Sequence, residues 1–148
     1  MKWRVIAVGK PALGYARSGV DEYLGRLKRY VRLEMVYLKD GGAGRILGAS
    51  DGCLRVLLDE QGICLSTEEI CERVVAWEGR AIKEVALIVG GADGHEDAVR
   101  AAADECWAFG KVTLQHELAL VVLLEQIYRV YTIKLGAPYH RSVGHGGR

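Results

Sequence analysis

The stretch Val85-Ala-Leu-Ile-Val-Gly-Gly91 decides the fold class of this chain, because an unbroken apolar run ends in a pair of glycines. A strand that is apolar at every position is typical of parallel sheets, where both faces are covered. Other runs with strand patterns lie at 3–8, 32–38, 54–58 and 111–114, and helical patterns separate most of them. Since parallel neighbours need crossover connections, the sequence predicts an α/β domain with a mostly parallel sheet and helices on both faces.

The helices are expected at 15–30, 66–78, 97–106 and 118–135. Ser66-Thr-Glu-Glu69 has the pattern of a capping box and marks the start of the second one. Two connections are expected to be irregular. Asp59-Glu-Gln-Gly62 predicts a turn, and 41–52, with five glycines, predicts a mobile loop around a short helical turn at 45–47.

The composition fits a single domain covering 1–148, because 148 residues with 50% hydrophobic side chains can bury a sizeable core. Twenty basic and nineteen acidic residues leave a formal net charge of +1. A dedicated nucleic-acid binder is usually strongly basic. A role on RNA would therefore need a local basic patch, a dimer that pools two patches, or recognition by shape.

The cysteines predict free thiols rather than a metal site. No pair has the spacing of zinc ligands, and no histidine pair complements them. They are Cys53, Cys64, Cys71 and Cys106. Free thiols are typical of a reducing cytosol. The chain opens directly on a strand pattern without a signal peptide, so a cytoplasmic location is expected.

The segment 118–135 is apolar enough to resemble a membrane span, but its polar residues favour a buried helix of a soluble protein. Glu125, Gln126, Arg129 and Lys134 would each be costly in lipid. The first half of the segment is apolar on every side, so the helix should be covered all round. In so small a domain one of its faces is expected to meet a second subunit, which predicts a homodimer.

The carboxyl ends of three predicted strands should wall one pocket. Gly90, Gly91 and Gly94 follow the strongest strand, 58–62 follows another, and 111–115 provides the third wall. Ligands of open α/β sheets bind at such an edge. The glycines lack the G-x-G-x-x-G spacing of a dinucleotide site, which argues against a nucleotide-dependent oxidoreductase. A plain strand-to-helix turn and a solvated acidic turn are the alternatives.

The end of the chain carries a second candidate cluster, Pro138-Tyr-His-Arg141. Arg141 could hold a phosphate, Tyr139 could stack on a base, and His140 could hydrogen-bond or move a proton. A disordered polar tail is the alternative. Glu125 and Arg129, four apart on the long helix, can pair on one face, and the alternative to a functional role is a structural ion pair.

The motifs taken together resemble one family. In chain order they are A-V-G-K, L-D-x-x-G, S-x-E-E, L-I-x-G-G-x-x-G, L-x-H, E-Q-x-Y-R and P-Y-H-R. In this order and spacing they resemble the RlmH family, the ribosomal RNA large subunit methyltransferases of the SPOUT superfamily. The resemblance covers Met1 to Arg141 and leaves 142–148 as an additional tail, expected to be flexible.

The resemblance implies a SPOUT-type fold with a C-terminal trefoil knot, a homodimer, and S-adenosylmethionine as methyl donor. The implied acceptor is N3 of a pseudouridine in helix 69 of the large-subunit (23S) rRNA, on an assembled ribosome. The methyl-transfer side would use Tyr139, His140 and Arg141, contributed across the dimer. The implied cofactor-binding residues are Leu58, Gly91, Gly110, Lys111, Val112, Thr113, Leu114 and Gln115.

Two residues depart from the family pattern. Members usually have proline where this chain has Gln115, and arginine where it has Leu120. The second departure bears on substrate binding or on the polarity of the dimer. It supports an alternative function, a non-catalytic knotted dimer that binds RNA or the ribosome.

Overall fold

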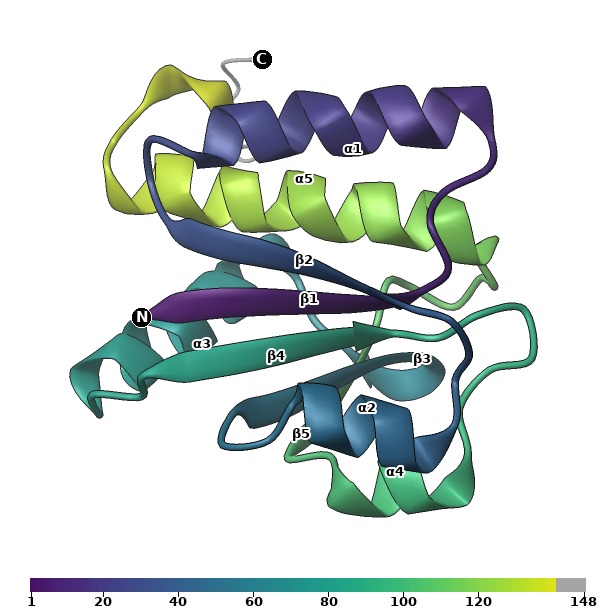
Figure 1. The fold of residues 1–148 in the computed structure, drawn as a ribbon. Helices are drawn as coiled ribbons and strands as arrows, with labels where there is room; N and C mark the ends of the chain where they lie inside the picture. The colour runs from purple at the N-terminus through teal and green to yellow at the C-terminus, as the bar shows by residue number, and fades with distance from the viewer. Residues whose placement is uncertain (141–148) are drawn as a thin grey trace.

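The computed structural model describes residues 1–140 and confirms the predicted α/β class (Figure 1). One sheet of five strands has the order β2-β1-β4-β3-β5, and every neighbouring pair is parallel. Its strands are β1 (Lys2–Val8), β2 (Arg32–Leu38), β3 (Leu54–Cys64), β4 (Glu84–Val89) and β5 (Glu105–Ala108). The central strand β4 is the continuous apolar run, as the sequence predicts.

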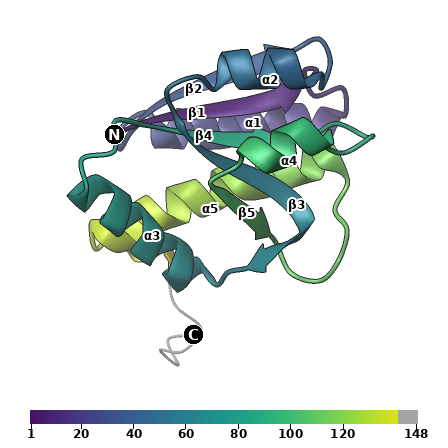
Figure 2. The same ribbon diagram turned by 90° about the horizontal axis from the view of Figure 1, so that it is seen from below.

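Helices cover both faces of the sheet, which confirms the second part of that prediction (Figures 1 and 2). One face carries α1 (Gly14–Leu27), α3 (Thr67–Gly79) and α5 (His116–Lys134). The other carries the short helices α2 (Ala43–Ala49) and α4 (Asp97–Ala102). A single 3₁₀ turn, η1 (Pro138–His140), follows α5.

The alternation along β4 explains why the chain needs two helical layers. Val85, Leu87 and Val89 belong to the larger core on the side of α1, α3 and α5. Ala86 and Ile88 belong to the smaller core beneath α2 and α4. Because successive side chains of a strand point to opposite faces, a strand that is apolar throughout is stable only between two covering layers.

The capping box at the start of α3 is present as predicted. The Ser66 hydroxyl accepts a hydrogen bond from the Glu69 amide at 3.1 Å, and the Glu69 carboxylate accepts one from the Ser66 amide at 2.8 Å. These two bonds satisfy two of the amides that every helix leaves unpaired at its first turn.

The prediction of a loop at 41–52 is wrong in part, because the short helical turn predicted at 45–47 is the middle of a seven-residue helix, α2, at 43–49. Ile46 is 1% exposed in the smaller core, and the Ala43 amide donates to the Glu96 carboxylate at 2.9 Å. Glycine costs a helix about 1 kcal/mol relative to alanine. Burial of Ile46 and capping from a distant residue offset that cost, and neither is visible in local sequence.

The prediction of a turn at 59–62 is also wrong, because β3 continues to Cys64. Its pairing with β5 shifts between Leu58 and Ile63, which marks a bulge. A Cβ at Gly62 would lie 2.7 Å from backbone atoms of Cys106 and Trp107. Only glycine allows the two strands to approach so closely at this point.

The segment after α4 also differs from the prediction. The predicted helix 97–106 ends at Ala102, and 105–108 form the edge strand β5 in place of the predicted strand 111–114. Trp107 is 2% exposed and stacks on Trp77, with ring centroids 5.9 Å apart. This long-range packing positions a four-residue strand that is too short to show a period.

Helix α5 lies between α1 and α3 on the larger core and supplies much of it (Figure 1). Its central residues are buried within one chain, whereas Leu118, Val121 and Val122 are only half-buried. No helix within 1–140 is long and apolar enough to cross a membrane. The trefoil knot stays a prediction of the resemblance, and 142–148 lie outside the described residues.

Candidate functional site

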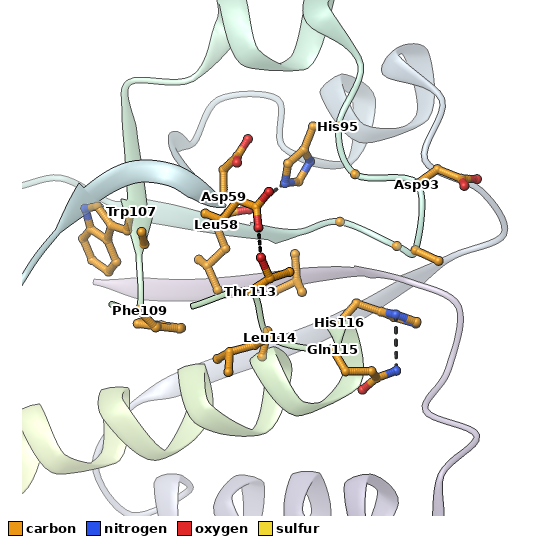
Figure 3. A pocket seen from close by; sticks show the side chains of 18 of the residues that line it. Leu58, Asp59, Asp93, His95, Trp107, Phe109, Thr113, Leu114, Gln115 and His116 are labelled. Carbon is orange, nitrogen blue, oxygen red and sulfur yellow. Dashed lines mark hydrogen bonds between the residues drawn. The ribbon is translucent and has the colours of Figure 1, made fainter. Parts of the chain in front are cut away.

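A cavity of about 610 Å³ lies beyond the carboxyl ends of β3, β4 and β5 (Figure 3). It is lined by the end of β3, the glycine turn after β4, the end of β5 and the segment that leads into α5. Six of the predicted cofactor residues line it: Leu58, Gly91, Val112, Thr113, Leu114 and Gln115. Gly110 and Lys111 belong to the same segment but are not among the lining residues.

The glycine turn forms one wall of the cavity and is held by its own backbone. The Gly94 amide donates to the Gly91 carbonyl at 3.1 Å, and Gly94 has φ of 78°. A Cβ at Gly91 would lie 3.3 Å from the side chain of Val8. Gly91 is therefore restricted by β1 as well as by the cavity, so a larger residue there would disturb the sheet in addition to any ligand.

His95 also belongs to this site, although no motif in the sequence points to it. Its Nε2 lies 2.7 Å from the Leu58 carbonyl, and the ring packs where a Cβ on Gly90 would otherwise lie, 3.0 Å from its Cε1. Because a carbonyl oxygen only accepts, Nε2 must donate, and the neutral ring then leaves Nδ1 as an acceptor. Nδ1 is buried and has no hydrogen-bond partner within 1–140.

The neutral state of His95 should make the glycine turn sensitive to acid. Burial lowers the pKa of His95, and the bond to Leu58 only partly opposes that shift. At a pH between the lowered pKa of His95 in the folded chain and its ordinary pKa of about 6.5 in the unfolded chain, the unfolded chain binds more protons than the folded chain. Stability should therefore fall as the pH falls through this window.

We expect His95→Gln to remove this part of the pH dependence, because glutamine can still donate to Leu58 but does not titrate. The measurement is the urea midpoint of parent and variant at pH 7.5 and pH 5. The parent should lose more between the two values than the variant does. Equal losses would mean that His95 does not couple stability to pH.

Two polar contacts tie the cavity walls together. Asp59 at the β3 bulge pairs with Arg100 of α4, and the Thr113 hydroxyl donates to the Glu60 carboxylate. The acidic pair that follows Leu58 is therefore not a solvated turn. It joins the strand to α4 on one side and to the segment before α5 on the other.

Gln115, where the family usually has proline, serves as the N-cap of α5. Its side-chain carbonyl accepts from the amides of Glu117 and Leu118 at 2.9 and 3.0 Å. Glu117 in turn accepts from the amides of Leu13 and Ala12 at 2.9 and 3.0 Å, and these bonds lower the pKa of its carboxyl. The departure thus has a structural role at the cavity edge.

Leu120, where the family usually has arginine, faces the larger core and is 2% exposed. It does not line the cavity. An apolar residue at this position therefore packs in the core of the described chain, and its departure from the family pattern removes no side chain from the cavity wall.

Tyr139 of the candidate cluster at the end of the chain lies apart from the cavity of its own chain. Tyr139 contacts α1 and the middle of α5, and it does not line the cavity. Gln115 at the cavity and Glu125 beneath Tyr139 are ten residues apart on α5, about 15 Å along a helix axis. Tyr139 is therefore not beside the glycine turn of its own chain. The side chain of His140 and all of Arg141 lie outside the described residues.

The predicted pairing of Glu125 with Arg129 is confirmed. The Arg129 Nη2 lies 2.7 Å from Glu125 Oε2, and the same oxygen accepts from Arg129 Nε at 3.0 Å. Within 1–140 no group of three or more potential metal ligands comes together, and the lack of a metal site stays a prediction.

The fold is similar to that of a probable methylase family protein from Haemophilus influenzae, with a TM-score of 0.63, 10% identity, and coverage of 90% of this chain and 68% of that one. At such identity the similarity shows the fold alone.

The chain matches the family model described as "Predicted SPOUT methyltransferase" over residues 1–140, and it belongs to this family. It is 50% identical over 141 residues to a protein of Thermus thermophilus named "Ribosomal RNA large subunit methyltransferase H", covering 95% of this chain and 99% of that protein. A protein of the same name from Deinococcus radiodurans is 41% identical over 146 residues, covering 96% of this chain and 100% of its own.

Proposed function

We propose that this chain transfers a methyl group from S-adenosylmethionine to N3 of a pseudouridine in helix 69 of 23S rRNA, on the assembled ribosome in the cytoplasm. The observation that carries the proposal is the cavity at the strand ends, lined by the glycine turn and by 112–115. The names of the relatives at 50% and 41% identity support rRNA as the substrate.

The cavity fits a methyl donor that has a nucleoside and an amino-acid part. Pockets for small molecules and cofactors usually enclose about 300–1,000 Å³ and combine apolar walls with a few polar groups. Here Leu58, Val89 and Leu114 supply apolar wall, while Thr113 and Gln115 supply polar groups. Leu58, Gly91 and the segment 110–115 would hold the donor, which supplies an electrophilic methyl group on a positively charged sulfur.

The protein's own contribution is to orient the base and to give its N3 proton a route away. His140 is the candidate for that route, because an imidazole with an ordinary pKa of about 6.5 can be neutral at working pH. Arg141 is the candidate phosphate clamp, because its planar guanidinium can bind two oxygens at once.

The terminal cluster would act at the cavity of a second copy in a homodimer, because Tyr139 does not line the cavity of its own chain. The half-buried apolar residues of α5 are the surface that a second copy could cover. We expect light scattering on dilute protein to give about twice the chain mass of 16.2 kDa. A stable monomer would contradict the composite site.

The proposed function is tested by methyl transfer from tritiated S-adenosylmethionine to unmethylated 70S ribosomes, with free rRNA as a second substrate. Label in 23S rRNA from ribosomes, mapped to helix 69, is the expected result. Calorimetry should show binding of S-adenosylmethionine and none of NAD. Binding of ribosomes without methyl transfer would favour the alternative, a non-catalytic dimer that binds RNA. The sequence feature that supports this alternative is Leu120 in place of the usual arginine.

A further inference from the structure

We propose that Tyr139 is a positioning residue whose hydroxyl, held by Glu125 and Tyr23, fixes η1 against α1 and α5, rather than a platform on which an RNA base stacks. The proposal rests on the proposed function, because the residues that Tyr139 would position are those assigned to methyl transfer. It assigns a role to Tyr23 of α1, a residue to which no motif points.

The hydroxyl groups form a directed chain of hydrogen bonds from α1 to α5. The Tyr139 hydroxyl donates to Glu125 Oε2 at 3.0 Å, and it lies 3.1 Å from the Tyr23 hydroxyl. An ionised carboxylate only accepts, so the single proton of Tyr139 is used on Glu125. Tyr23 must therefore donate to the Tyr139 oxygen.

The carboxylate that receives this chain is itself fixed. Glu125 Oε2 accepts from Arg129, as described above, and Glu125 Oε1 accepts from the Gln126 side chain at 2.7 Å. Hydrogen bonds to a charged acceptor are roughly twice as strong as those between neutral groups. Glu125 is thus a firm attachment point for η1 on α5.

The ring of Tyr139 already has partners that a base would have to displace. The Arg129 guanidinium lies 4.9 Å and that of Arg26 5.7 Å from its centroid. The Tyr128 ring meets it edge-on, with centroids 4.7 Å apart. These contacts occupy the π-surface that stacking would require.

The protonation of Tyr139 agrees with an anchoring role. Burial, together with the bonds to Tyr23 and Glu125, raises the pKa of Tyr139 far above its ordinary value. The group stays protonated at every physiological pH, so it is a permanent donor to Glu125. It is also excluded as an acceptor of the N3 proton.

The test removes one hydroxyl at a time while keeping each ring. We expect Tyr139→Phe and Tyr23→Phe each to lower kcat for methyl transfer to ribosomes by about tenfold, as the loss of a hydrogen bond near a charge predicts. The affinity for S-adenosylmethionine should not change. The double variant should have about the same kcat as the slower of the two single variants, because both changes break the same chain of hydrogen bonds.

Tyr30→Phe is the matched control. Tyr30 packs on Tyr128 in the same aromatic cluster, with centroids 5.8 Å apart, and its hydroxyl has no hydrogen-bond partner within 1–140. Its variant should keep the parental kcat. Two outcomes would overturn the proposal. One is a double variant of Tyr23 and Tyr139 whose loss of kcat is the product of the two single losses. The other is parental kcat in Tyr139→Phe with a loss only in Tyr139→Leu, because a ring that stacks on a base needs no hydroxyl.

A measurement without activity separates this proposal from the proposed function. Hydrogen exchange of the amides at 136–140 should be faster in Tyr139→Phe and Tyr23→Phe than in the parent, and unchanged in Tyr30→Phe. If the parent methylates no ribosome but exchange responds in this way, the anchor exists and the proposed function fails. If the parent is active and exchange does not respond, the anchor is refuted and the function stands.

Discussion

Methyl transfer to ribosomes is expected to fall by roughly 10–10⁴-fold when Arg141 is replaced with alanine, the range typical of losing a positioned group that acts in the transition state. Loss of the guanidinium would leave the substrate phosphate without its two-point partner. Affinity for S-adenosylmethionine should barely change, because the cavity residues are untouched. Single-turnover transfer and calorimetry measure the two quantities separately.

His140→Ala is expected to lower transfer within the same range. Solvent water could carry the N3 proton instead, in which case His140 only positions the base and its loss would raise KM with little change in kcat. Arg80→Ala is a suitable control, since it removes one exposed positive charge after α3. Parental rates in both the His140 and Arg141 variants would remove this cluster from the active site.

The elements that the sequence predicts correctly are those with a local pattern long enough to read. The continuous run of β4 predicts a parallel sheet with two helical layers, and the capping box predicts the start of α3. The polar residues within 118–135 predict a buried helix, and the structure has α5 there. Each of these depends on periodicity or on a cap, which neighbouring residues alone determine.

The elements that the sequence misses depend on contacts between distant segments. The extension of β3 past Leu58 requires Gly62 to lie against the backbone of β5, and β5 depends on Trp107 packing against α3. The full length of α2 depends on the burial of Ile46 and on the hydrogen bond that the Ala43 amide donates to Glu96. No local pattern carries these pairings, because tertiary contacts override propensity in short segments.

The candidate site likewise contains residues that the sequence predicts and residues that it misses. The rule that ligands lie at strand ends leads to Leu58, Gly91 and the segment before α5, and the structure brings residues of all three to one cavity. His95 could not be predicted, because its place depends on the missing side chain at Gly90. Tyr23 and Tyr139 are 116 residues apart, and only the pairing of α1 with α5 shows that their hydroxyls meet.

Leu124→Ala is expected to lower the free energy of unfolding by about 2–5 kcal/mol, because the leucine lies in the larger core and the alanine would leave a cavity there. Leu124 is fully buried within one chain, so this loss should not depend on a second subunit. Urea unfolding of parent and variant at pH 7.5, at equal protein concentration, measures it.

Leu135→Ala provides the matched control, since Leu135 follows the same helix and is 63% exposed. Its change should stay within about 0.5 kcal/mol, the range usual for surface substitutions. A Leu124 variant as stable as the Leu135 variant would show that α5 does not pack in the core of its own chain as the structure has it.

The half-buried Leu118 distinguishes packing within one chain from contact between two chains. Its replacement with alanine should lower the free energy of unfolding more at protein concentrations where the dimer forms than at those where it dissociates.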